Sequence, residues 1–239
     1  MRREVVLVFL LTLLLGITIW VTSLKQIGVY RVFTFGDLFY SAWAHLKMVC
    51  VAVVIATSLG VPLGILITRS GFERLVVPVI GGASIGQTIP SLAVIAVMAP
   101  FLGFGFRSAV VALVIYGVLP VLRNTYASIR SIDPAVVEAA RGMGMTRLQI
   151  ARRIELPLAR PVIMAGIRVS TVITVGTAEL AVLVGGTGLG KITLTGVFAR
   201  EALIILQGAA PTAAMAILLG FLLQSVEKWM KPRGMAVSA

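Results

Sequence analysis

The chain has 239 residues, of which 59% are hydrophobic and only 13% are charged. Soluble domains carry roughly 25% charged residues, so this composition excludes an ordinary soluble enzyme, a disordered chain and a coiled coil. Lys and Arg number 21 against 9 Asp and Glu, giving a net charge of +12, and the chain holds one cysteine and one histidine. These counts exclude an internal disulfide, a cysteine-based metal cluster and a multi-histidine metal site.

Long uncharged runs predict an all-α integral membrane protein with six spans in one domain, residues 1–239. A helix of about 20 apolar residues crosses the roughly 30 Å of hydrocarbon in a bilayer. The first run follows Arg2 and Arg3, as in a signal peptide, but it is longer than a signal peptide's apolar core. No small-residue cleavage site directly follows it, so we expect an uncleaved helix. The expected spans lie at residues 5–24, 48–68, 75–99, 107–123, 161–184 and 202–226.

The distribution of basic residues predicts the orientation. With both termini in the cytoplasm, 14 Lys and Arg residues lie inside and 6 outside, while one more lies within a span. Cytoplasmic loops carry the excess of positive charge, so we expect this orientation, and the charge is explained without nucleic acid. The outside set comprises Lys25, Arg31, Lys47, Arg107, Lys191 and Arg200.

The long cytoplasmic loop, residues 124–160, carries signals for two helices joined by a turn. Asp133 is a helix cap for an expected helix Pro134–Arg141, and Gly142-Met143-Gly144 breaks that helix. Thr146 to Gln149 has the spacing of a capping box, and Pro157 is expected to end the second helix. We call residues 134–156 the elbow. We expect a partner protein to bind and push this segment. The alternative is that it lies as a helix on anionic lipid.

Seven residues of this loop match the pattern E-A-A-x3-G-x9-I-x-L-P at every position. The pattern resembles the EAA loop of permease subunits in binding-protein-dependent ABC importers. That resemblance extends from about Trp43 to Glu227 and implies a fold similar to the methionine permeases. It also implies that the elbow docks on a separate ATPase subunit. The matching residues are Glu138, Ala139, Ala140, Gly144, Ile154, Leu156 and Pro157.

Three further stretches are similar to the osmoprotectant permeases, which import glycine betaine, choline or carnitine. They are GQTIPS at 86–91, YGVLPVLRNT at 116–125 and GGTGLG at 185–190. The chain departs from that subfamily at Glu179, where a small or hydroxyl residue is usual. A carboxylate inside a span is costly, so it either assists a cationic substrate or anchors a neighbouring span.

A translocation path is expected beside the helix break at Pro90 in the third span. Gln87, Thr88 and Ser91 flank this proline, and polar side chains beside freed carbonyls suit a path through the bilayer. The alternative is a kink whose hydroxyls bond back to the backbone. With Glu179, these residues form the expected path.

The resemblance implies a permease subunit of the bacterial cytoplasmic membrane, with no catalytic residue, metal site or cofactor of its own. ATP and Mg belong to the ABC ATPase partner. The other expected partners are a second permease subunit, identical or related, an extracytoplasmic substrate-binding protein and membrane lipid. Two alternatives stay open: import of an amino acid, methionine or another small solute, and a membrane scaffold that does not transport.

Overall fold

The computed structural model describes residues 2–24, 26–27, 30–31 and 33–230. Lys25, counted above for orientation, lies outside these residues. Five helices are long and apolar enough to cross a membrane, or six if a bent pair counts as one span, which confirms the predicted fold class. The long helices are α1 (Arg2–Ser23), α2 (Phe35–Leu66), α5 (Phe106–Arg130), α8 (Leu156–Ala178) and α10 (Ala202–Trp229).

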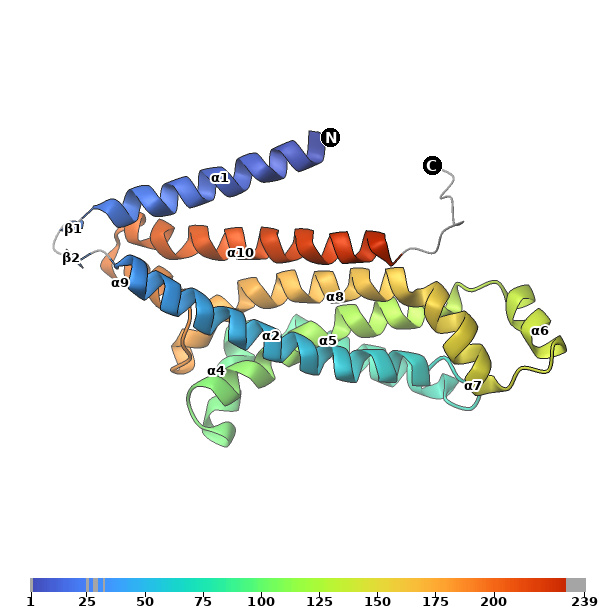
Figure 1. The fold of residues 1–239 in the computed structure, drawn as a ribbon. Helices are drawn as coiled ribbons and strands as arrows, with labels where there is room; N and C mark the ends of the chain where they lie inside the picture. The colour runs from blue at the N-terminus through green and yellow to red at the C-terminus, as the bar shows by residue number, and fades with distance from the viewer. Residues whose placement is uncertain (1, 25, 28–29, 32, 231–239) are drawn as a thin grey trace.

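The helices form a bundle with short elements at both ends (Figure 1). One end carries two-residue strands β1 (Gln26–Ile27) and β2 (Tyr30–Arg31), which pair antiparallel, and α9 (Gly190–Ala199). The other end carries α6 (Pro134–Gly142) and α7 (Arg147–Ile150). The first residues of α1 and the last residues of α10 both lie toward the end of the bundle that carries α6 (Figure 1).

Helix α2 is longer than expected at its N-terminal end. The hydrophobic run predicted a span from residue 48, but the helix begins at Phe35. Thr34 caps it: the Asp37 N–H donates to Thr34 Oγ1 over 3.3 Å, and the Thr34 N–H donates to Asp37 Oδ2 over 2.9 Å. This reciprocal capping box fixes a helix start that hydropathy alone does not mark.

The third span is broken, as its proline predicts. A 3-10 turn (Glu73–Leu75) leads into α3 (Val76–Thr88), and α4 (Ser91–Leu102) follows at an angle of 99°. Pro100 lies inside α4, which ends at Leu102 and is followed by Gly103. Two short helical halves therefore replace one straight span.

Helices α2 and α8 pack closely on α5, which lies between them in the core. A Cβ at Gly64 of α2 would lie 2.7 Å from the Thr125 side chain, and one at Gly166 of α8 would lie 2.9 Å from the Pro120 carbonyl. Only a residue without a side chain permits this approach. The core has its largest fully buried side chains at Met48, Ile95, Leu113 and Leu122.

Candidate functional site

The first limb of the elbow is α6, and its ends are closed by local hydrogen bonds. Asp133 Oδ1 accepts from the Ala135 N–H over 2.9 Å, which confirms the predicted cap. At the other end, Gly144 has a φ of +79°, and the Met145 N–H donates to the Ala140 carbonyl over 3.2 Å. A glycine at positive φ is a common helix terminator, so the break lies where the sequence places it.

The second limb begins at its predicted cap but does not end where expected. The Thr146 N–H donates to Gln149 Oε1 over 2.8 Å, and the Gln149 N–H donates back to Thr146 Oγ1 over 3.3 Å. Pro157 was expected to stop the helix near Leu156, and that prediction is wrong. A π-helical turn, Ala151–Glu155, joins α7 to α8 without interruption.

The π-helical turn explains why Pro157 is tolerated. A proline lacks an N–H and its ring crowds the carbonyl of the preceding turn, which breaks a regular helix interior. A π turn is wider and shifts the hydrogen-bond register by one residue. Pro157 then occupies the first turn of α8, where a proline costs little. As a result the second limb and the span are one continuous helix.

The seven motif residues divide into an exposed group and a packed group. Glu138 and Ala139 on the first limb and Gly144 in the turn after it are exposed, whereas Ala140 is only 1% exposed. The other three, Ile154, Leu156 and Pro157, are half-buried at the joint with α8. Three motif residues are therefore open to a partner, and the other four pack the elbow onto the rest of the chain.

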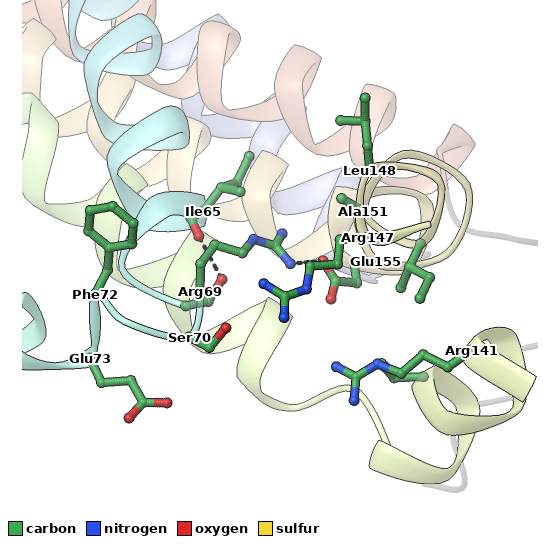
Figure 2. A pocket seen from close by; sticks show the side chains of 13 residues that line it. Ile65, Arg69, Ser70, Phe72, Glu73, Arg141, Arg147, Leu148, Ala151 and Glu155 are labelled. Carbon is green, nitrogen blue, oxygen red and sulfur yellow. Dashed lines mark hydrogen bonds and ion pairs between the residues drawn. The ribbon is translucent and has the colours of Figure 1, made fainter. Parts of the chain in front are cut away.

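A cavity of about 650 Å³ separates the elbow from the C-terminal end of α2 (Figure 2). Arg69, just beyond α2, reaches across and places its Nη1 2.6 Å from Glu155 Oε2. The Arg141 and Arg147 side chains extend from the elbow toward the same space (Figure 2). The elbow is thus linked to the end of α2 by an ion pair and to α8 by a continuous helix.

The residues of the expected path are held against α5. Gln87 Nε2 donates to the Tyr116 carbonyl over 2.7 Å, and the Tyr116 hydroxyl donates to the Ile89 carbonyl. These bonds satisfy one backbone carbonyl at the break, that of Ile89, and one of α5, that of Tyr116. Thr88 bonds back to the Ile85 carbonyl over 2.8 Å, as the kink alternative requires. Thr88 and Pro90 are nevertheless exposed, and Gln87 and Ser91 are half-buried.

Glu179 lies at the start of a 3-10 turn (Glu179–Val184) that follows α8. The Thr212 hydroxyl of α10 donates to Glu179 Oε1, so the carboxylate bonds to a neighbouring span. Its Oε2 is buried and has no hydrogen-bond partner among the described residues. One oxygen thus fits the anchor alternative, and the other oxygen still has the capacity to accept a hydrogen bond.

Two interhelical contacts of polar side chains complete the site. His45 of α2 is fully buried, with its Nε2 3.0 Å from the Val175 carbonyl of α8. The sequence predicts no role for this lone histidine. Its signal was helical spacing, since Ser41, Met48 and Ala52 lie on the same buried face. Arg168, the basic residue within a span, places its Nε 3.3 Å from Glu227 Oε2 of α10.

Sequence comparisons with known proteins give matches over most of the chain. Residues 60–234 match the family model for the binding-protein-dependent transport system inner membrane component. The choline transport system permease protein OpuBB of Bacillus subtilis is 42% identical over 200 residues, covering 84% of this chain and 91% of its own. The osmoprotectant import permease protein OsmY of Salmonella typhimurium is 36% identical over 235 residues, covering 97% of each chain.

A solved structure shares the fold. A chain of the MetNI methionine ABC transporter, in an inward-facing form, superimposes with a TM-score of 0.75 at 23% sequence identity. The match covers 82% of this chain and 97% of that one. The expected similarity to the methionine permeases is confirmed at the level of the fold.

Proposed function

Because the chain belongs to the family of binding-protein-dependent transport system inner membrane components, we propose that it couples ATP hydrolysis in a separate ATPase to import of a quaternary-amine osmoprotectant. The continuous helix from the elbow into α8 carries this proposal. A force on the exposed first limb reaches the membrane through that helix and through the Arg69–Glu155 ion pair. The elbow is therefore the coupling element.

The elbow surface suits a protein partner better than a lipid surface. Ala139 and Gly144 leave room for close approach, and Glu138 places a carboxylate among them. A carboxylate is unfavourable against anionic lipid headgroups but can pair with a basic or polar group of a protein. The ATPase binds ATP and Mg, so this chain needs no cofactor and performs no catalysis.

The substrate proposal rests on the relatives together with the polar groups in the membrane. Relatives named for transport of choline, carnitine and glycine betaine are about 40% identical to this chain. All three compounds carry a quaternary ammonium group. The exposed break at Thr88 and Pro90 supplies hydroxyl and carbonyl groups for a path, and Glu179 supplies a carboxylate. An amino-acid substrate is the alternative.

The complete importer needs more than this chain. A second permease subunit, identical or related, encloses the path with the exposed break of the third span. A substrate-binding protein delivers the solute on the extracytoplasmic side, and both termini of this chain lie in the cytoplasm. The elbows of the two permeases then face two ATPase subunits.

Uptake by reconstituted vesicles tests the function. Vesicles holding the permease with its ATPase and binding protein should accumulate radiolabelled choline, carnitine or glycine betaine only with ATP inside and binding protein outside. Unlabelled methionine or histidine should not compete. Competition by those amino acids would shift the proposal to amino-acid import, and a lack of any ATP-dependent uptake would favour a scaffold.

A further inference from the structure

The Arg69–Glu155 ion pair joins two parts of the molecule that are far apart in the sequence. Arg69 follows the last turn of α2, and Glu155 ends the π-helical turn between α7 and α8. Arg69 Nη1 lies 2.6 Å from Glu155 Oε2, and the Glu155 side chain is only 10% exposed (Figure 2). Glu155 occupies an unspecified position of the EAA pattern, so the motif does not account for it.

The surroundings leave this pair without an alternative partner. Glu73, Arg141 and Arg147 line the same cavity, but none of them forms an ion pair with either member among the described residues. Arg69 Nη2 is buried without a hydrogen-bond partner there. The Arg69 side chain is 31% exposed and that of Glu155 is 10% exposed, and a partly exposed pair of this kind contributes little net stability. A purely stabilising role therefore accounts poorly for the pair.

Helix α2 is tied to α8 at its other end as well. His45 of α2 contacts the Val175 carbonyl at 3.0 Å, near the outer end of α8. The two helices are thus joined by polar contacts at both ends, with α5 packed against both of them. If only the inner contact broke, α8 could follow the elbow while α2 stayed in place.

We propose that the Arg69–Glu155 pair is a positioning contact that makes α2 move with the elbow. The ATPase pushes the elbow, Glu155 carries Arg69 with it, and α2 and α8 shift as one unit around α5. The broken third span follows because Gln87 and Tyr116 hold it on α5. This inference rests on the proposed coupling function of the elbow.

Neutral variants separate transmission from folding. Each variant removes one charge: Glu155→Gln keeps the size and polarity of the side chain, and Arg69→Gln keeps a polar side chain that is shorter. Reconstituted with ATPase and binding protein, they should bind the ATPase and hydrolyse ATP as the wild type does. The number of solute molecules imported per ATP should fall about three- to tenfold, as expected when a coupling contact is lost. Arg74→Gln and Glu73→Gln are matched controls, because both residues lie exposed in the adjoining turn.

A charge reversal identifies the pair itself. Arg69→Glu combined with Glu155→Arg should restore the import-to-ATP ratio to within about twofold of the wild type, because the contact is rebuilt in the opposite sense. If a neutral variant does not assemble, Arg69→Lys is measured in its place. This variant keeps the charge and should keep the wild-type import-to-ATP ratio.

The outcomes discriminate between the two proposals. Three results would overturn the proposed role of the pair without contradicting the importer function. They are a wild-type import-to-ATP ratio in both neutral variants, a low ratio in Arg69→Lys, and a double reversal that does not restore the ratio. If the wild-type complex itself imports nothing, the proposed function fails instead. Loss of ATPase binding in the neutral variants would make the pair part of the docking surface and would also overturn transmission.

Discussion

Glu179 combines two properties that can be separated by substitution. Its Oε1 accepts from the Thr212 hydroxyl, and its Oε2 is buried without a hydrogen-bond partner among the described residues. In Glu179→Gln the amide oxygen still accepts from Thr212, so only the charge is lost. We expect the half-saturating substrate concentration to rise several-fold in vesicle uptake, with unchanged abundance in the membrane.

Thr212→Val is the complementary change, because it keeps the charge and removes the hydrogen bond. It should lower the stability of the solubilised protein by about 1 kcal/mol and leave the half-saturating concentration near the wild-type value. If Glu179→Gln instead lost stability and kept its substrate affinity, the carboxylate would be an anchor only.

At the scale of single residues, the sequence identifies which side chains are unusual but not what they contact. Arg168 and Glu179 attract attention because a charge inside a span is costly. Their partners, Glu227 and Thr212, lie 59 and 33 residues away, and no local pattern connects them. His45 was missed for the same reason: its contact is a backbone carbonyl of another helix, which leaves no trace in residue types.

At the scale of elements, Gly144 tests the elbow. A valine at a φ of +79° is strongly strained, at about 1–3 kcal/mol, so Gly144→Val should distort the turn. Because the spans are untouched, the protein should insert normally but retain less ATPase in a pull-down and show correspondingly lower uptake.

Gly142→Val is the matched control for that substitution. Gly142 lies in ordinary helical backbone at the end of α6, and a Cβ at either glycine would meet nothing within 4 Å. The control should therefore stay close to the wild type. Equal behaviour of the two variants would argue against the turn as the feature that the ATPase reads.

The close approach of α8 to α5 leads to a second prediction for elements. Gly166→Ala places a methyl 2.7 Å from the Asn124 Cβ and should destabilise the solubilised protein by about 1–3 kcal/mol. Gly176→Ala, in the same helix with nothing within 4 Å, should be neutral or slightly stabilising. Thermal unfolding in detergent measures both, and similar melting temperatures would contradict the packing argument.

Local signals predicted the elements well wherever the structure is decided locally. The caps at Asp133 and Thr146 and the turn at Gly144 follow from side-chain and backbone chemistry within a few residues. Pro157 was misjudged because a π-helical turn has no sequence signal of its own, and tertiary packing decides whether it forms. The extra turns of α2 before residue 48 were missed because hydropathy outweighed the capping box at Thr34.

At the scale of the whole molecule, composition and the EAA spacing predicted the fold class and the family. Uncharged runs report burial in lipid directly, so six segments could be counted without a structure. The way the helices pack around α5 could not be predicted, because nearly every face of each helix is apolar and periodicity carries little information. The glycine contacts and polar ties at Gly64, Gly166, His45 and Arg69 supply what periodicity lacks.

The orientation of the whole molecule in the membrane gives the last prediction. The excess of Lys and Arg on the elbow side predicts that this side is cytoplasmic. In a Cys50→Ser background, Lys191→Cys on α9 should react with a membrane-impermeant thiol reagent in intact cells. Arg147→Cys in the elbow should react only after the membrane is opened, although both residues are exposed. The proposed coupling role requires the elbow to contact an ATPase in the cytoplasm. Labelling of Arg147→Cys from outside would therefore contradict both the six-span orientation and the coupling role.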